Sequence, residues 1–241
     1  MKTPLIAAAA LAALAIAGCS KASDAAFGQR VHAYLMEHPE VIQEAAQRLQ
    51  EKQQAAAAKA STDAIQKYRA QLERDPRDIV LNPNGKVTVV EFFDYRCGYC
   101  KLAAPEVVKL VQEHPDVRFV LKQFPIFGEV SDTAAKVALT PAARGKALDL
   151  YKVWMAEKAL DETTLDRDLQ AVGVDAAAAR KAAADPAIEQ QILDTRALAN
   201  NLKIEGTPAF VVGDTMIPGA DLAALRTAIA IARDGGLKKP A

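Results

Sequence analysis

Two stripes of hydrophobic residues at helical spacing follow the first 26 residues of the chain. The first stripe runs from Phe27 to Leu35 and the second from Val41 to Leu49, on either side of Pro39. Residues three or four positions apart lie on one face of a helix, and proline is tolerated in a helix's first turn. The pattern therefore predicts two short amphipathic helices that meet near Pro39.

These helices need a partner for their hydrophobic faces, because helices of this length are marginal in isolation. We expect contact with further copies of the chain, and the alternative is a helical hairpin packed on the chain's own body. Between residues 50 and 62 the stripe fades into Ala, Gln and Lys, which favour helix but offer little to bury. We assign residues 20–73 to a helical oligomerisation arm and linker.

The pattern changes to strand, helix and strand after Arg74. Residues 87–93 form an apolar run rich in β-branched and aromatic side chains, which is typical of a buried parallel strand. Residues 98–113 carry apolar positions at helical spacing with a bend expected at Pro105, and residues 117–124 indicate a second strand. This order predicts a right-handed βαβ unit with parallel strands.

A block of helical patterns follows this unit over most of residues 131–202. Two short strands at 209–212 and 215–218 and an amphipathic helix at 221–232 complete the pattern. We therefore predict an α/β domain over residues 74–241, with a helical insertion at about residues 131–202. The length of 241 residues allows one sizeable core, and a net charge of zero offers no reason to expect nucleic acid as a partner.

Residues 1–19 have the pattern of an export signal. Lys2 precedes an apolar stretch from Pro4 to Ala17, which is too short for a convincing membrane span. The segment ends in Ile-Ala-Gly and Cys19, which resembles the lipobox of bacterial lipoproteins and predicts lipidation of Cys19. The alternative is an ordinary secretory signal with an incidental cysteine. Both interpretations place the mature protein in the periplasm, where disulfides persist, and the lipobox adds a membrane anchor.

The motif Cys97-Gly98-Tyr99-Cys100 lies where the predicted strand ends and a helix begins. Unpaired backbone N–H groups and the positive end of the helix dipole favour a thiolate there, and the thiolate is the nucleophile of disulfide exchange. We predict that Cys97 is the exposed attacking thiolate and Cys100 the buried resolving thiol. Gly98 and Tyr99 set the turn between them.

A metal site is the alternative for such a pair. Zinc sites of this kind normally use a second cysteine pair or a histidine pair. The sequence has no second pair, and His32, His38 and His114 do not show ligand spacing. We expect neither a metal nor a cofactor at the two cysteines.

Thr207-Pro208 stands just before a predicted strand, and Glu91 interrupts the apolar strand that precedes the cysteines. Together with the CxxC motif, these residues resemble thioredoxin-fold oxidoreductases, in which a cis-proline loop faces the two cysteines. The resemblance implies that Thr207 and Pro208 bind an extended substrate segment, beside Gly98 and Tyr99. It also implies that Glu91 is a buried acid that exchanges a proton with the second cysteine. The alternative for Glu91 is a strand-edge side chain that reaches solvent.

Over about residues 78–233 the chain resembles the DsbA-like family of bacterial periplasmic proteins. The segment from Phe92 to Lys101 is especially similar to the ScsC branch, named for suppression of copper sensitivity. Gly98-Tyr99 and Thr207 depart from DsbA and are similar to the disulfide isomerase DsbC. The resemblance implies a thioredoxin fold with an inserted helical domain, preceded by an N-terminal helical arm.

We therefore predict a periplasmic thiol–disulfide interchange protein with isomerase or reductase activity on misfolded or oxidised secreted proteins. The resemblance to ScsC also implies a homo-oligomer, with a trimer favoured, and a membrane thiol reductase similar to DsbD or ScsB as electron donor. One alternative is a DsbA-like thiol oxidase. Another is a copper-binding protein of metal tolerance that uses the same two thiols, because copper(I) prefers thiolate ligands.

Overall fold

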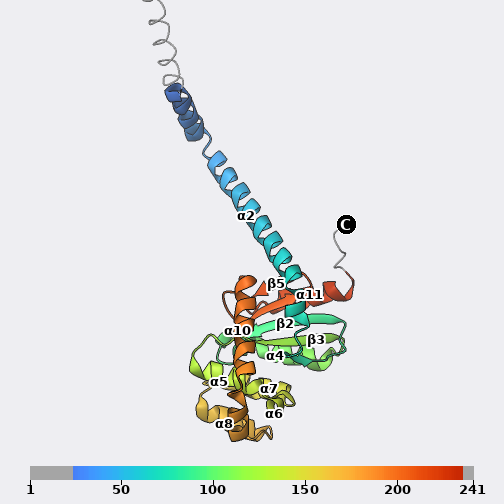
Figure 1. The fold of residues 1–241 in the computed structure, drawn as a ribbon. Coiled ribbons are helices and arrows are strands. Elements are labelled where there is room, and N and C mark those ends of the chain that lie inside the picture. Colours follow the sequence, from blue (N-terminus) through green and yellow to red (C-terminus); the bar gives the residue numbers. More distant parts are fainter. Residues whose placement is uncertain (1–23, 236–241) are drawn as a thin grey trace, which may run out of the picture. The chain divides into compact units, whose positions relative to one another are not determined.

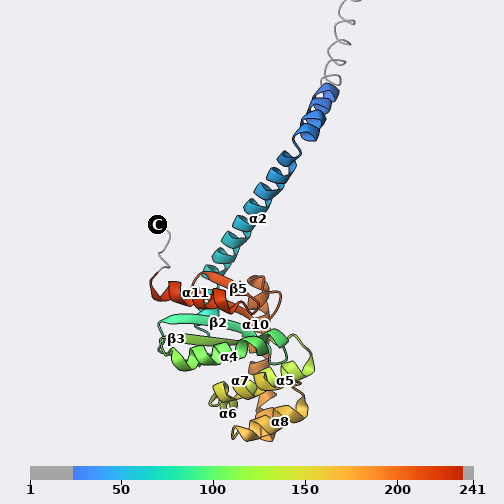
Figure 2. The same cartoon turned by 180° about the vertical axis from the view of Figure 1, so that it is seen from behind.

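The computed structural model describes residues 24–235, and the predicted export signal with Cys19 lies outside this range. The chain divides into two compact units, with the boundary in the sequence between Ala57 and Ala58. Figures 1 and 2 show their helices and strands from opposite sides. In the described part of the chain, no helix combines the length and apolar character that a membrane crossing needs.

The N-terminal unit contains the first of the two helices that the hydrophobic stripes predict and most of the second. The first covers residues 24–37, and α2 (Glu40–Lys67) begins directly after Pro39. Hydrophobic side chains of the stripes are exposed, and Phe27, Tyr34 and Leu49 each expose more than half of their surface. The described chain therefore leaves this apolar face without a cover of its own.

The larger unit is built on a five-stranded mixed sheet with the strand order β1-β3-β2-β4-β5. The strands are β1 (Ile79–Leu81), β2 (Val87–Phe93), β3 (Val117–Gln123), β4 (Ala209–Val212) and β5 (Thr215–Pro218). The central pair of β2 and β3 is parallel, as predicted, and the other neighbours are antiparallel. We did not predict β1, because three residues are too few to show a period of two.

The helices of this unit include the predicted active-site helix and the helical block. They are α3 (Arg69–Glu73), α4 (Gly98–Glu113), α5 (Glu129–Ala138), α6 (Pro141–Arg144), α7 (Ala147–Ala156), α8 (Glu162–Ala171), α9 (Ala176–Ala183), α10 (Pro186–Asn201) and α11 (Leu222–Arg233). The inserted block is α5 to α10, and α4 packs against α7 within the unit. The insertion therefore contacts the helix that begins at the cysteine motif.

The two faces of the sheet carry separate hydrophobic clusters. Successive side chains of a strand point to opposite faces, so Glu91 and Phe93 face α4 and α7, whereas Val90 and Phe92 face away from them. The second face is covered by the end of α2, by α3 and by the C-terminal part of α10. The sheet thus separates the active-site side from a second core.

Residues 58–73, which we assigned to the arm, pack with the sheet. Ile65 of α2 and Leu72 of α3 are fully buried in the second core. Arg69 contacts the carboxylate of Asp214 and donates to the carbonyl of Gly213 at 3.3 Å, so the helices also hold the turn between β4 and β5. The compact unit therefore begins before the predicted boundary at Arg74, because these buried side chains belong to its core.

Candidate active site

Cys97 is the N-cap of α4, so the first cysteine sits at the helix N-terminus, as predicted. Its extended backbone (φ −68°, ψ 121°) turns the chain from the strand into the helix, and its sulfur accepts a hydrogen bond from the Cys100 N–H at 3.4 Å. Both cysteines of the motif are free thiols. A helix N-terminus stabilises a negative charge on this sulfur.

The Thr207-Pro208 loop faces this sulfur, as the resemblance to thioredoxin-fold proteins implied. The peptide bond between Thr207 and Pro208 is cis. The Cys97 thiol donates a hydrogen bond to the Thr207 carbonyl oxygen at 3.1 Å. Two segments that lie 110 residues apart in the chain therefore form one site.

The prediction that Cys97 is exposed is wrong, whereas the prediction that Cys100 is buried is confirmed. Only 2% of Cys97 is exposed, and Cys100 is completely buried. The Thr207 carbonyl contacts the Cys97 sulfur and covers it, while Gly98 and Tyr99 are exposed beside it. Exposed Tyr99 and the cis-proline loop therefore border the buried sulfur.

The two thiols differ strongly in their acidity. A hydrogen bond from the Cys100 side chain, helped by backbone N–H groups and opposed by burial, lowers the pKa of Cys97 to about 6. Burial raises the pKa of Cys100, and the neighbouring Cys97 and the charge of Glu91 raise it further. The Cys97 thiol therefore ionises far more readily than the Cys100 thiol, which suits attack by the first and resolution by the second.

Glu91 is completely buried, so the alternative of a side chain that reaches solvent is wrong. Burial raises its pKa to about 8, and a hydrogen bond from the Tyr151 side chain opposes this rise. Its partners in register on β3 and β4 are Leu121 and Phe210, which are apolar. A carboxyl group in such a setting can exchange a proton near neutral pH.

Tyr151, whose hydroxyl bonds to this carboxyl group, belongs to a cluster of aromatic rings. Phe93, Tyr95, Tyr151 and Trp154 are buried and contact one another edge to face, with ring centroids 4.9–6.4 Å apart. Sequence reasoning missed Tyr151, because it lies in the insertion 60 residues from Glu91 and occupies an ordinary core position of α7. The site therefore draws on β2, α4 and the inserted helices together.

Asp94 organises the loop that flanks the cysteines. Its buried carboxylate accepts hydrogen bonds from the N–H groups of Ile126 at 2.7 Å and Phe127 at 3.1 Å. It also accepts bonds from the Arg96 N–H and the Ser131 hydroxyl. The side chains of Ile126 and Phe127 are exposed on this loop. One carboxylate thus fixes an apolar surface next to the motif.

Lys101 joins the active-site helix to the insertion. Its ammonium group donates to the carbonyl oxygens of Trp154 at 3.0 Å and Glu157 at 2.6 Å, at the C-terminal end of α7. These carbonyls lack partners within their helix, so the lysine caps it. Within residues 24–235, no group of three or more His, Cys, Asp or Glu side chains is arranged to hold a metal ion.

The fold and this geometry define a class of protein. Residues 88–230 match the family model of the DSBA-like thioredoxin domain, and the chain belongs to this family. The domain has the thioredoxin fold that thiol–disulfide oxidoreductases use, with a cysteine pair at a helix N-terminus and a facing cis-proline. Residues 24–56 match a second model, the copper resistance protein ScsC N-terminal domain.

Solved structures extend this similarity over most of the chain. The chain is similar to BcfH from Salmonella enterica Typhimurium, with 34% identity, coverage of 91% of this chain and 99% of that one, and a TM-score of 0.70. It is also similar to a ScsC variant from Proteus mirabilis, with 26% identity, coverage of 85% and 92%, and a TM-score of 0.67.

The curated relatives are longer than the matched region. One is the thiol:disulfide interchange protein DsbA of Bordetella pertussis, which is 32% identical over 54% of this chain and 64% of its own length. Another is the Na(+)/H(+) antiporter NhaA 3 of Salinispora tropica, which is 30% identical over 57% of this chain but only 22% of its own length. The chain therefore spans less than two thirds of these relatives.

Proposed function

We propose that this chain is a periplasmic thiol–disulfide interchange protein that acts first as an isomerase or reductase on disulfides of other secreted proteins. The observation that carries the proposal is the position of the Cys97 sulfur, between the N-terminus of α4 and the cis-proline loop. Cys100 and Glu91 lie buried behind it. A similar structure from Salmonella enterica is named a periplasmic thioredoxin-like protein, which supports the location.

The reaction begins with attack by the Cys97 thiolate on a substrate disulfide. A mixed disulfide forms, and the other substrate sulfur leaves as a thiolate. Cys100 then attacks the Cys97 sulfur and transfers its proton to Glu91, the Cys97–Cys100 bond forms, and the second substrate sulfur leaves. The substrate gains two electrons and the protein loses two, so a thiol reductase must restore the dithiol. In isomerisation, a substrate thiolate attacks the mixed disulfide instead, and no net electrons move.

The surface beside the sulfur suits an extended peptide. The backbone of Thr207 and Pro208 offers strand-like pairing to such a segment, and the Thr207 hydroxyl is buried without a partner among the described residues. Exposed Tyr99, Ile126 and Phe127 add hydrophobic contacts. This combination favours unfolded or misfolded chains, whose backbone and apolar side chains are accessible.

The dipeptide between the cysteines favours isomerase or reductase activity over oxidase activity. Gly98 and Tyr99 add no positive charge, and the pKa of Cys97 is lowered to about 6. Strong oxidases have a thiolate with a pKa near about 3.5, which stabilises their reduced form. A less acidic thiol makes the disulfide less oxidising, so the protein can act in its reduced form. A DsbA-like oxidase remains the alternative to be tested.

Self-association through the N-terminal helices completes the proposal. The exposed stripe around Phe27, Tyr34 and Leu49 needs a cover, and the match of residues 24–56 to the ScsC N-terminal model favours a trimer. Several sites held together can bind one substrate while its bonds rearrange. We also propose a lipid anchor at Cys19 and a membrane reductase of the DsbD or ScsB type as electron donor.

Trapping tests the chemistry. In Cys100→Ala, the mixed disulfide cannot resolve, so the variant should retain secreted proteins through Cys97, and Cys97→Ser should retain none. Reactivation of a scrambled-disulfide protein by the full chain then separates isomerase from oxidase, which would act only on a reduced substrate. Absence of trapped proteins together with tight copper(I) binding would instead support the metal-tolerance alternative.

The role of the arm is tested in the full-length protein. Phe27→Lys combined with Tyr34→Lys places charges on the exposed stripe without touching the larger unit. We expect a lower mass by light scattering and loss of scrambled-protein reactivation, with simple reduction of a small disulfide unchanged. A wild-type chain that is monomeric at micromolar concentration would contradict the oligomer.

A further inference from the structure

The hydroxyl of Tyr151 meets both carboxyl oxygens of Glu91. The two O–O distances are 3.0 and 3.2 Å, and both residues are buried. Among the hydrogen bonds of the described residues, no other group donates to this carboxyl. One phenol from the inserted helix α7 is therefore the partner of the acid that lies behind the cysteines.

The other groups around Glu91 do not supply a positive charge. Cys97 and Cys100 face it from α4, Tyr95 lies beside it after β2, and its register partners on β3 and β4 are apolar. Lys101, the basic residue next to the motif, directs its ammonium to carbonyls of α7. An ionised Glu91 thus depends on the Tyr151 hydroxyl for direct stabilisation.

Packing holds that hydroxyl in place. The Tyr151 ring is 1% exposed and contacts Phe93 edge to face at 5.3 Å and Tyr95 at 6.4 Å. Rings packed in this way keep one rotamer, because any other would collide with the close-packed interior. The hydroxyl is therefore positioned before the reaction starts.

We propose that Tyr151 is a positioning residue for the resolving step, which holds Glu91 and stabilises its ionised form so that it can accept the proton of Cys100. This inference rests on the proposed thiol–disulfide exchange. In that step the Cys100 proton passes to Glu91, the Cys97–Cys100 bond forms, and the bond from Cys97 to the substrate sulfur breaks. The substrate leaves as a thiolate, so charge and electrons balance.

The direction of the effect follows from two opposing causes. Burial raises the pKa of Glu91, and the Tyr151 hydrogen bond lowers it again toward the neutral range. A hydrogen bond to the charged form favours that form. Without the hydroxyl, Glu91 stays protonated to higher pH, and Cys100 loses the acceptor for its proton. Through Tyr151, the inserted domain contributes to the chemistry of the site as well as to its packing.

Tyr151→Phe in the full chain tests the proposal, because it removes one oxygen and keeps the ring. The matched control is Tyr95→Phe, which removes another buried hydroxyl from the same aromatic cluster, one that lies 3.4 Å from the Gln123 amide. Single-turnover release of a thiol from a preformed mixed disulfide on Cys97 measures resolution between pH 6 and 10. Alkylation of Cys97 in the reduced protein measures the attacking thiolate separately.

We expect resolution at pH 7 to slow about tenfold in Tyr151→Phe, which corresponds to a rise of about one unit in the midpoint of the pH profile. The rate should approach that of the wild type above the new midpoint, and alkylation of Cys97 and the Tyr95→Phe profile should not change. An unchanged profile in Tyr151→Phe overturns the proposal. The proposal is also overturned if Tyr151→Phe and Tyr95→Phe slow resolution by the same factor at every pH, since that result indicates an effect of packing alone.

Titration of the Glu91 carboxyl by carbon NMR separates this inference from the proposed function. It needs no substrate, and the Glu91 pKa should be higher in Tyr151→Phe than in the wild type. If the wild-type protein exchanges no disulfides but this rise is observed, the proposed function fails while the contact is confirmed. If exchange occurs without any rise, the role of Tyr151 is wrong.

Discussion

The two faces of the central sheet bury ionisable groups in opposite ways. On the face covered by α3 and α10, Lys122 of β3 lies 2.5 Å from Asp78 and 2.6 Å from the Gln71 carbonyl oxygen. On the active-site face, Glu91 of β2 has a single hydroxyl partner and no opposite charge. Both carboxyl groups have raised pKa values because of burial, about 6 for Asp78 and about 8 for Glu91.

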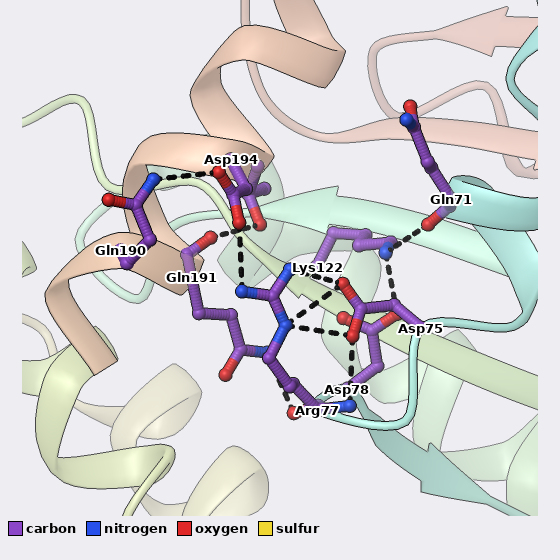
Figure 3. Close-up of polar contacts among 9 residues, drawn as sticks. Gln71, Asp75, Arg77, Asp78, Lys122, Gln190, Gln191 and Asp194 are labelled. Atoms are coloured by element: carbon purple, nitrogen blue, oxygen red, sulfur yellow. Dashed lines mark hydrogen bonds and ion pairs between the residues drawn. The ribbon is translucent and has the colours of Figure 1, made fainter. Parts of the chain in front are cut away.

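Figure 3 shows the polar contacts around Lys122 and Asp78 and their neighbours. Arg77 bonds to Asp75 and to Asp194 of α10, and Gln191 donates to the Arg77 carbonyl. These contacts tie the segment before β1 to α10. The comparison indicates that a buried charge with charged partners holds the chain together, whereas a buried acid without them is free to exchange a proton.

The largest effect should come from breaking the paired side. Lys122→Met leaves Asp78 buried without its partner, and we expect a loss of about 3–5 kcal/mol in the free energy of unfolding. Urea denaturation measures this loss. The double variant Lys122→Met and Asp78→Leu is the control and should recover much of it, because an apolar pair leaves no unpaired charge. Equal stability of the single variant and the wild type would contradict the comparison.

Glu91→Gln should affect the rate of the reaction, whereas Lys122→Met affects stability. We expect resolution of the mixed disulfide to slow about 10²-fold, because the general acid–base group is lost. Since the folded-state pKa of Glu91 is raised from 4.5 to about 8, its contribution to stability is fully present at low pH and is lost as the pH rises through about 8. Denaturation at pH 6 and pH 9 should therefore show a pH-dependent loss in the wild type that is smaller in Glu91→Gln.

Asp94 sharpens the comparison, because neutral donors alone satisfy its carboxylate. Asp94→Ala leaves the N–H groups of Ile126 and Phe127 without an acceptor, and we expect a loss of about 1–3 kcal/mol. The rate of mixed-disulfide formation with an unfolded substrate should also fall, because the loop loses its fixed position. Ser131→Ala, which removes one donor, is the control with a smaller effect. Unchanged stability and an unchanged rate would show that the loop keeps its conformation without the Asp94 carboxylate.

The acidity of Cys97 should appear as a midpoint near pH 6 in its alkylation rate. Its folded-state pKa is lowered from 9.0 to about 6, so its contribution to the stability of the reduced form is present at high pH and lost as the pH falls through 6. In Cys100→Ala the midpoint should rise, because the thiol hydrogen bond is removed, and the rate below it should change about tenfold per pH unit. An unmoved midpoint would assign the acidity to the helix N-terminus alone.

The smallest effect should come from a contact at the surface. Arg69 and Asp214 are each about one third exposed, so Arg69→Ala should cost about 0.2–1 kcal/mol. Urea denaturation at low and high salt measures the loss, which should shrink as salt increases. A loss as large as that of Lys122→Met would show that exposure does not separate these two pairs.

The sequence by itself determined the elements that depend on local patterns. The apolar run of residues 87–93 and the helical spacing after Gly98 place Cys97 at a strand–helix junction, and the structure confirms this position. Glu91 was recognisable because a charged residue interrupts an apolar strand. Thr207-Pro208 was recognisable from its resemblance to a known motif. Local chemistry and spacing are enough for such features.

Only the tertiary structure decided which side chains meet. Tyr151 reaches Glu91 across 60 residues, and Lys122 pairs with Asp78 across 44, and no periodicity marks these partners. The cover on Cys97 likewise comes from Thr207, so its burial was missed. Each of these contacts depends on how the chain folds back on the sheet. The acidity of a buried group depends on those distant partners, which is why the sequence located the reactive residues but not the groups that tune them.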